Sequence, residues 1–401
     1  MVRIQLSEWE TTEPLELTEQ DLNTLQQEIN NNSTKIGVSH TRNGKNKLHT
    51  KQYVGLFPLP SGKTIEIRPK AAENNLLNLL RYASGTPVSV IKNQQKLEKG
   101  TNLVDTVGQL FLDELKQLLS QGMRREYVRK QSREDYVRGQ IQVHKQLQTQ
   151  RAAATDFECS YEDLTYDTIS NQTILYSTTV LSSLVNDTDL KSELSHYREL
   201  LKNRVTLKQV QPVELEQIKI NRLKQDYQDI LQLCELVITS SFVESLETGL
   251  TQSYSFLLNM NTVFEKVVER AFTEVLQEQD YRVKPQHLTD NLVSGTPNIN
   301  MYPDILIESS EDSVLVADAK WKTSTQNSDI YQLVSYTLAH ETPGLLIYPE
   351  QQGERETQYE VKTGRDLHLV EIPTKSRENF DKWYKDLKES LAISLEQMLN
   401  R

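Results

Sequence analysis

The chain has little cysteine, no long apolar run and a shortage of positive charge. Of its 401 residues only two are cysteines, Cys159 and Cys234, and their separation matches no metal-binding spacing. We expect both to be buried thiols in a reducing cytoplasm. No apolar run approaches the roughly 20 residues that a membrane span needs, and the N-terminus lacks the basic and apolar pattern of a signal peptide. The expected location is therefore cytoplasmic, away from membranes.

Two chemical signatures are also missing. The seven histidines are scattered and form no H-E-x-x-H pattern, and no G-x-x-x-x-G-K-[ST] loop is present, so the chain itself should not hydrolyse nucleotides. Lysine and arginine number 45 against 56 aspartates and glutamates, a net charge of −11. This balance argues against a surface coated for DNA binding. Contact with nucleic acid would need local basic patches or a partner that brings the DNA.

The most informative segment is Asp318-Ala319-Lys320, which follows Pro303-Asp304 by the length of a hairpin. The pattern predicts strands over 298–308 and 314–321, joined by a polar turn over 309–313. Side chains two apart share a face of a strand, so Asp318 and Lys320 should point the same way. The hairpin should bring Asp304 beside Asp318. This is the PD-(D/E)xK pattern of metal-dependent nucleases.

Two carboxylates, Asp304 and Asp318, are ligands suited to a hard cation, and we expect magnesium. The metal would polarise a phosphate and lower the pKa of an attacking water. Lys320 would orient that water or neutralise charge on the phosphate. Asp-x-Lys alone is usually a solvated ion pair, but here a helical stripe over 263–276 precedes the strands and a second helix follows. Helix, strand pair, helix, strand is the order of the nuclease core.

Three further side chains are candidates for supporting roles. Glu265 opens the first helix and would either add a third carboxylate to the metal or be a solvated helix charge, like Glu269 one turn later. Gln332 and Tyr336 lie one turn apart on the second helix. They would contact the DNA backbone, steady Lys320, or simply pack on the sheet.

We expect an α+β fold with three parts. Residues 1–160 should form a β-rich domain that contacts a partner, 161–250 a helical connector, and 251–401 an α/β restriction-endonuclease-like domain that begins near Tyr254. In the first part, Thr18 is a predicted helix N-cap with Asp21 at the third helical position. The other predicted strands are 35–40, 47–59, 64–68, 344–348 and 367–372. The helix that Thr18 caps lies within 13–29, and the other predicted helices are 74–82, 105–119, 168–184, 190–202, 218–239 and 379–400.

The stretch from Arg124 to Lys145 is strongly basic, and Tyr127 and Tyr136 lie within it. This stretch would contact DNA phosphates or the nucleotide site of a partner. The alternative is an ordinary polar hairpin that turns at Arg138-Gly139. The candidate partner-binding residues are Arg124, Arg125, Arg129 and Arg138.

With these pieces in order, the chain resembles the McrC-like family, the endonuclease subunits of McrBC modification-dependent (type IV) restriction systems. The resemblance rests on the following segments: Val54-Gly55 with 61–70, 138–141, Asp167 with Asn171, Phe264-Glu265, Pro303-Asp304 and 318–322. It implies a partner, an McrB-like AAA+ GTPase ring that recognises methylated double-stranded DNA and translocates. The McrC-like subunit would plug the ring with its N-terminal part, stimulate GTP hydrolysis and cut.

Two other functions stay open. The chain could be a non-catalytic activator of an AAA+ motor that keeps the nuclease fold only as a scaffold, although a scaffold has no need for two like charges close together. It could also be a stand-alone RecB-like repair nuclease. A GTPase gene beside this one would favour restriction, and its absence would favour repair.

Overall fold

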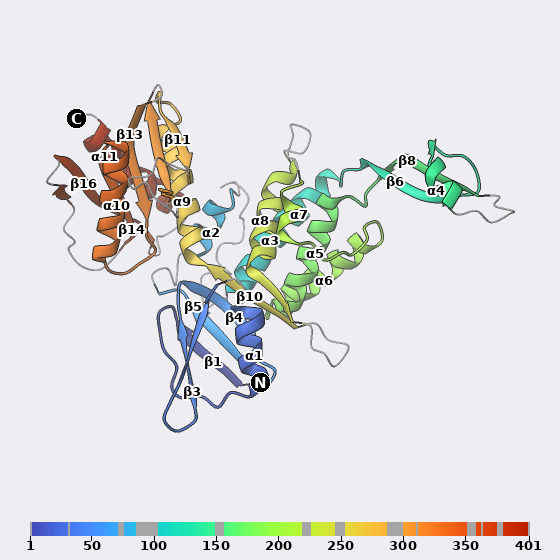
Figure 1. Ribbon diagram of the computed structural model, residues 1–401, viewed down its shortest axis with the longest axis horizontal. Coiled ribbons are helices and arrows are strands. Elements are labelled where there is room, and N and C mark those ends of the chain that lie inside the picture. The colour runs from blue at the N-terminus through green and yellow to red at the C-terminus, as the bar shows by residue number, and fades with distance from the viewer. Residues whose placement is uncertain are drawn as a thin grey trace. The chain divides into compact units, whose positions relative to one another are not determined.

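The computed structural model describes residues 2–30, 33–70, 76–85, 103–148, 156–218, 226–244, 253–286, 300–309, 312–350, 358–361, 364–374 and 380–399. The chain forms two compact units (Figure 1): Met1–Val107 with Ser240–Arg401, and Gly108–Thr239. The first unit is therefore built from both ends of the sequence. The predicted domain boundaries at residues 160 and 250 stay predictions.

The first sheet of this unit has the order β1-β5-β4-β10-β9. Its strands are β1 (Val2–Ser7), β4 (Tyr53–Pro58), β5 (Lys63–Arg68), β9 (Ser241–Glu244) and β10 (Ser253–Asn259). We predicted that the segment near Tyr254 opens the nuclease domain, but β10 pairs antiparallel with β4. A Cβ at Gly55 would lie 2.0 Å from the carbonyl oxygen of Phe256, so this pairing requires glycine there. An apolar strand pattern does not name its partner strand, so the sequence alone could not assign this segment to the first sheet.

The rest of the N-terminal region follows the predictions, except that the predicted strand 47–59 is two strands, Asn46–Thr50 and Tyr53–Pro58. Thr18 caps α1 (Glu19–Asn23) in a capping box with Asp21. The helix continues as the π-helix η1 (Thr24–Ile29), and β2 (Ile36–His40) pairs with β3 (Asn46–Thr50). Leu25, Ile29, Phe57 and Ile65 are part of one buried core between these elements and the sheet. Helix α2 (Leu76–Ala83) follows β5.

The second sheet has the order β11-β12-β13-β14-β16-β15. Its strands are β11 (Arg282–Pro285), β12 (Ile305–Ser309), β13 (Asp312–Ala319), β14 (Gly344–Pro349), β15 (Gln358–Val361) and β16 (Arg365–Ile372). β12 and β13 form the predicted antiparallel hairpin, although β12 begins at Ile305 and the predicted start, with Ile299, lies outside the described residues. β13, β14 and β16 run parallel.

Three helices cover this sheet (Figure 1): α9 (Met260–Leu276), α10 (Asn327–His340) and α11 (Phe380–Leu399). Leu333 and Tyr336 of α10 pack with Val316, Leu346 and Tyr348 on one face. α9 and α11 contact each other and β13. Helices therefore cover both faces of the sheet, and β14 is buried along its whole length, as is usual for a strand of a parallel sheet.

The second unit is mainly helical and carries a small β-structure (Figure 1). Its helices are α3 (Leu103–Gln121), α5 (Ile169–Leu184), α6 (Thr188–Lys202), α7 (Pro212–Leu215) and α8 (Gln228–Ser240). The β-structure, which we call the hairpin subdomain, is made of β6 (Glu126–Glu134), β7 (Gln140–Ile141), α4 (Val143–Gln148) and β8 (Phe157–Thr165), with strand order β6-β8-β7.

The predicted helical connector over 161–250 contains strands at both of its ends. Residues 160–165 belong to β8, which pairs along its length with β6, and Ser241–Glu244 form β9. Over residues 161–165 of β8, exposed side chains alternate with half-buried ones, a period of two in a segment that contains few β-branched residues. Cys159 and Cys234 are buried free thiols, as predicted. Among the described residues, no helix has the length and apolarity to cross a membrane.

Candidate active site

Asp304 and Asp318 lie at the same end of the β12–β13 hairpin. The ladder pairs Ile305 with Ala317, so the residues one step further, Asp304 and Asp318, face each other across the hairpin. Asp304 Oδ2 accepts a hydrogen bond from the backbone N–H of Ala319 at 2.8 Å. The side chain of Asp318 is only 1% exposed. The structure therefore brings the two predicted carboxylates together.

Lys320 lies directly after β13, beside Asp318. Its backbone N–H donates to the carbonyl of Ile347 at 2.8 Å. Its ammonium Nζ lies 2.5 Å from Asp318 Oδ2 in an ion pair. Apart from this ion pair, the two buried carboxylate oxygens of Asp318 accept no hydrogen bond from the described residues. Buried acceptors with free lone pairs are what a cation ligand needs.

The electrostatics of this group are those of two carboxylates forced together. Burial and the neighbouring charge of Asp304 raise the pKa of Asp318 to about 7. Burial also raises the pKa of Asp304, against the opposing effect of the Ala319 N–H. For Lys320, burial lowers the pKa, but the Asp318 carboxylate outweighs it and the pKa is raised overall. The lysine therefore stays charged, and the carboxylates lack the counter-charge that a divalent cation would supply.

Glu265 is half-buried on α9, and its charge interacts with the charges of Asp318 and Lys320. Burial raises its pKa, while Lys320 lowers it and Asp318 raises it further. Within the described part of the chain, however, no three His, Cys, Asp or Glu side chains are arranged to hold a metal ion. Glu265 therefore does not complete a three-carboxylate cluster with Asp304 and Asp318. The pair alone still fits magnesium, which commonly binds one or two carboxylates and keeps several waters.

Gln332 and Tyr336 support the segment before Asp304. Gln332 Nε2 donates to the hydroxyl of Tyr336 at 2.8 Å, and that hydroxyl donates to the carbonyl of Tyr302 at 3.1 Å. Tyr336 is 5% exposed and belongs to the core of the second sheet. The pair thus packs on the sheet and fixes the backbone two residues before Asp304. Neither residue donates to Lys320 in the described contacts.

A second lysine contact near the site has no counterpart in the sequence-based predictions. Lys322 Nζ lies 2.6 Å from Asp329 on α10, and Asp329 also accepts from the hydroxyl of Tyr348 at 3.2 Å. Asp329 is 2% exposed. The only signal in the sequence is Asp329 at the third position of α10, where it completes a capping box with Gln326. This pattern predicts a helix start and not a buried ion pair.

The four candidate partner-binding arginines do not form one cluster. Arg124 lies before the hairpin subdomain and its Nε contacts both carboxylate oxygens of Asp226, at 2.9 and 3.0 Å. Arg125 lies 5.6 Å from the ring centroid of Tyr166. Arg129 donates to Ser160 Oγ at 2.9 Å within the β-structure.

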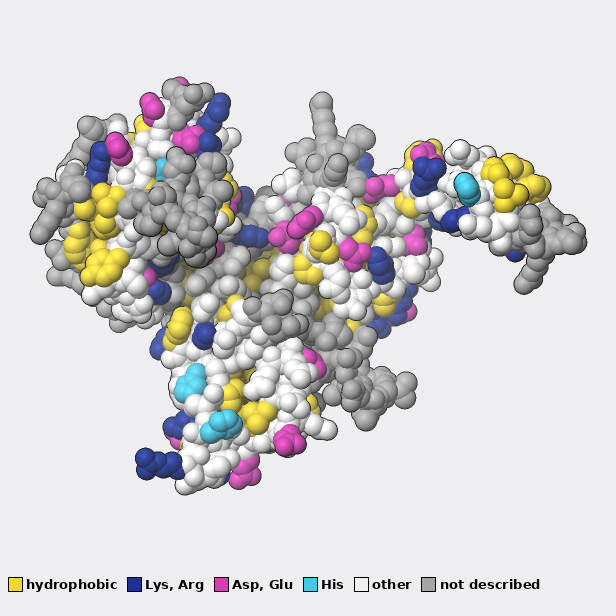
Figure 2. Space-filling model, in the orientation of Figure 1, with side chains coloured by type: hydrophobic (Ala, Val, Ile, Leu, Met, Phe, Trp, Pro, Cys, Tyr) yellow, Lys and Arg dark blue, Asp and Glu magenta, His cyan; other side chains and the backbone are white. Residues whose placement is uncertain are grey.

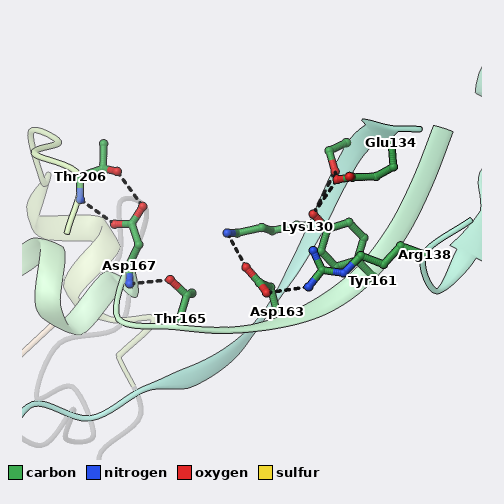
Figure 3. A network of polar contacts seen from close by, with 9 residues as sticks. Lys130, Glu134, Arg138, Tyr161, Asp163, Thr165, Asp167 and Thr206 are labelled. Carbon is green, nitrogen blue, oxygen red and sulfur yellow. Dashed lines mark hydrogen bonds and ion pairs between the residues drawn. The ribbon is translucent and has the colours of Figure 1, made fainter. Parts of the chain in front are cut away.

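Arg138 belongs to a local network in the hairpin subdomain (Figure 3). Its guanidinium and the ammonium of Lys130 both point at Asp163, at 3.0 and 2.7 Å. The guanidinium also lies 3.9 Å from the ring centroid of Tyr161. The side chain of Arg138 is nevertheless 40% exposed, so it is held in place and still accessible.

Asp167 and Asn171 fasten the base of the hairpin subdomain to the helices. Asp167 accepts from the backbone N–H and the hydroxyl of Thr206, as Figure 3 shows, at 2.9 and 2.7 Å. Asn171, which is 1% exposed, donates to the carbonyls of Arg124 and Tyr166 at 3.1 and 2.7 Å. It also accepts from the hydroxyl of Tyr227 at 3.0 Å. The two strands that leave the helices are thus held side by side at their base.

The hairpin subdomain presents an unusual amount of apolar surface. Figure 2 shows hydrophobic side chains gathered on it. Large hydrophobic side chains are exposed on β6, on β8, on the turn after β6 and on α4. They are Tyr127, Tyr136, Val137, Val143, Leu147 and Leu164. Exposed apolar patches are frequent at interaction surfaces of proteins.

The fold and the site together define a class: an α+β protein with a half-buried and a buried carboxylate, Asp304 and Asp318, and a lysine at the end of a strand hairpin. The chain belongs to the family described as McrBC 5-methylcytosine restriction system component, whose model matches residues 48–349. The resemblance seen in the sequence is thereby confirmed for the McrBC family as a whole.

Two known proteins illustrate the relationship. The chain is 22% identical over 331 residues to the type IV methyl-directed restriction enzyme EcoKMcrBC of Escherichia coli (strain K12), covering 76% of this chain and 93% of that protein. It is also similar to a chain in a half-complex of the tetradecameric assembly of Thermococcus gammatolerans McrB AAA+ hexamers with bound McrC. That match has a TM-score of 0.58 at 15% identity and covers 98% of this chain and 100% of the other, which shows a shared fold.

Proposed function

We propose that this chain is the nuclease component of an McrBC-type restriction system and cuts double-stranded DNA by magnesium-dependent hydrolysis of a phosphodiester bond. The observation that carries the proposal is the pair of half-buried Asp304 and buried Asp318, with Lys320 in contact with Asp318. A pair of like charges, one of them 1% exposed, costs free energy unless a cation compensates it.

The assignment to the McrC-like component rests on what the sequence lacks. The solved assembly to which this fold is similar is described as McrB AAA+ hexamers with bound McrC. The present chain has no P-loop sequence, so it cannot supply the nucleotide site of an AAA+ ring. We therefore assign it the role of the McrC component and an McrB-like GTPase the role of its partner.

In the proposed reaction each residue has one task. Asp304 and Asp318 would hold magnesium, which when bound polarises the scissile phosphate and lowers the pKa of a bound water. Lys320 carries its positive charge beside the phosphate position and stabilises the developing negative charge. Tyr336 fixes the backbone before Asp304, supported by Gln332. Glu265 adds negative charge to the edge of the site.

The hairpin subdomain is the part we assign to the motor partner. It combines exposed apolar side chains with the accessible Arg138, and Arg129 lies on one of its strands. Arg124 and Arg125 lie at its base. An arginine held by an aromatic ring and an aspartate, as Arg138 is, could approach the partner's nucleotide without losing side-chain entropy on binding. Because the chain has a net charge of −11, we also expect the motor to bring the DNA.

The test is plasmid cleavage by the purified chain, with methylated and unmethylated plasmids, with and without the McrB-like protein and GTP. We expect cutting only of methylated plasmid, only with the partner and magnesium, and none by an Asp318→Asn variant. Robust cutting by the chain alone would favour the repair-nuclease function. Full stimulation of the partner's GTPase without any cutting, unchanged by Asp318→Asn, would favour a non-catalytic activator.

A further inference from the structure

Glu8 is a carboxylate buried far from water in the N-terminal sheet. It follows β1 and is 1% exposed. Its backbone N–H donates to the carbonyl of Arg68 at 3.0 Å, and its Oε2 accepts from the backbone N–H of Lys70 at 3.0 Å. Glu8 is thus fixed to the ends of two adjacent strands, β1 and β5.

The other partner of this carboxylate is 313 residues away in the sequence. The indole Nε1–H of Trp321 donates to both carboxylate oxygens of Glu8, at 3.0 and 3.1 Å. Trp321 is 3% exposed, and its ring lies 5.4 Å from that of Phe264, which precedes Glu265 on α9. The N-terminal sheet therefore reaches the residue that directly follows Lys320.

Joining two surfaces through this contact costs free energy, because a carboxyl group must be removed from water. The hydrogen-bond donors to Glu8 are neutral N–H groups, and burial raises the pKa of Glu8 to about 7. An apolar pair of similar size would join the same surfaces without the cost of desolvating a carboxyl group. What the polar contact adds is direction, because a hydrogen bond fixes the rotation of the indole as well as its depth.

We propose that Glu8 is a positioning residue for Lys320, acting through Trp321, an inference that rests on the proposed nuclease function. Lys320 is the first residue beyond β13, and its N–H bond to Ile347 is its tie to the neighbouring strand. The Glu8–Trp321 contact fixes the chain on the other side of Lys320, and Lys322 is fixed in turn by Asp329. The lysine ammonium is held against Asp318 because the backbone on both sides of it cannot rotate.

The test uses the full chain with its motor partner, GTP and magnesium, and four variants. Glu8→Gln keeps the size and removes the charge. Trp321→Phe keeps the ring against Phe264 and removes the donor, and the double variant removes both groups. The matched control is Trp383→Phe, which also loses one buried indole hydrogen bond, to the carbonyl of Pro373 at 2.8 Å, but on α11 and with no part in the Glu8–Trp321 contact.

Single-turnover cleavage separates positioning from folding, because the amplitude counts active molecules and the rate constant reports the chemistry. Glu8→Gln and Trp321→Phe should lower the rate constant by about ten- to a hundredfold, as residues that orient active-site ligands do. The DNA concentration for half-maximal rate should not change. The double variant should be no slower than the slower single variant, because both break the same contact. Trp383→Phe should lower only the amplitude or the melting temperature.

A spectroscopic readout tests the contact itself without any cleavage. The chain has three tryptophans, hence three indole N–H signals in a ¹⁵N-correlated NMR spectrum. Above pH 7, where Glu8 is ionised, the signal that Trp321→Phe removes should move upfield in Glu8→Gln, since the indole loses a charged acceptor. An unmoved signal would overturn the proposal, as would wild-type rate constants in both single variants, or an equal fall of the rate constant in Trp383→Phe.

Cleavage by these variants distinguishes an error in the nuclease site from an error in the positioning role of Glu8. If the wild-type protein cuts, Asp318→Asn does not, and Glu8→Gln and Trp321→Phe cut at the wild-type rate, only the positioning role is wrong. If Asp318→Asn cuts as fast as the wild-type protein, the nuclease site is wrong and the positioning role falls with it.

Discussion

Lys320 is the residue on which the proposed chemistry depends most, because it is the cation in contact with the carboxylate pair. We predict that Lys320→Met lowers the single-turnover cleavage rate roughly 10²- to 10³-fold, the usual effect of removing one charge-stabilising group. Both carboxylates remain, so binding of Mn²⁺ measured by calorimetry should persist. Lys284→Met, which breaks a 2.7 Å ion pair with Glu308 in the same sheet, is the matched control. Near-wild-type cutting by Lys320→Met would remove this residue from the mechanism.

Asp318 gives a second prediction, for the metal-free protein. An unfolded aspartate titrates near 3.8, whereas burial and Asp304 raise the pKa of Asp318 to about 7. Between these pH values the folded chain binds a proton that the unfolded chain has lost. This contribution to the free energy of unfolding is thus complete below pH 4 and is lost as pH rises to about 7.

Asp318→Asn lacks this titration. In a chelator, urea denaturation between pH 5 and pH 8 should show a variant that gains stability relative to the wild-type protein as pH rises, and that is the more stable of the two above pH 7. Added magnesium should stabilise the wild-type protein and leave the variant unchanged. Parallel stability curves for the two proteins would show that Asp318 is not strained in the folded state.

At the scale of single elements, Asn171 carries the junction between the hairpin subdomain and α5. Its amide serves two carbonyls and one hydroxyl in a buried place, and alanine would remove all three of these hydrogen bonds. We predict that Asn171→Ala lowers the free energy of unfolding of the unit Gly108–Thr239 by about 3 kcal/mol. Gln172→Ala, which removes one half-buried bond to Asp167, should cost much less. Equal losses in the two variants, measured by denaturant titration, would contradict this account.

The elements also show what the sequence could and could not predict. The β12–β13 hairpin, which places Asp304 opposite Asp318, was predictable because a polar turn joins two apolar segments, and the Thr18 cap was predictable because capping is local. The pairing of β10 with β4 was not, since strand patterns carry no information about distant partners. The role of Glu8 could not be predicted for the same reason. A single glutamate is ordinarily expected to be exposed to solvent, and its partner Trp321 lies 313 residues away in the sequence.

At the scale of the whole molecule, the function proposed for the two units can be separated. The carboxylate site lies in the unit built from both ends of the chain, and the hairpin subdomain lies in the unit Gly108–Thr239. Removing everything before residue 160 would be a poor test, because it deletes β4, the partner of β10, and Glu8, the acceptor of the Trp321 indole. An internal deletion avoids both losses.

Residues 126–165 can be excised because their flanks already lie together. Glu126 pairs with Thr165, and Asn171 binds the carbonyls of Arg124 and Tyr166 at once, so a short glycine-serine link can join Arg125 to Tyr166. We predict that this deletion abolishes stimulation of the partner's GTPase, because it removes the exposed apolar surface and Arg138. The first unit should keep its circular dichroism, its melting transition and its Mn²⁺ binding.

Asp318→Ala should behave in the opposite way, with full GTPase stimulation and no cleavage. If the deletion still stimulates, the hairpin subdomain does not face the motor; if Asp318→Ala loses stimulation as well, the two functions are not separable.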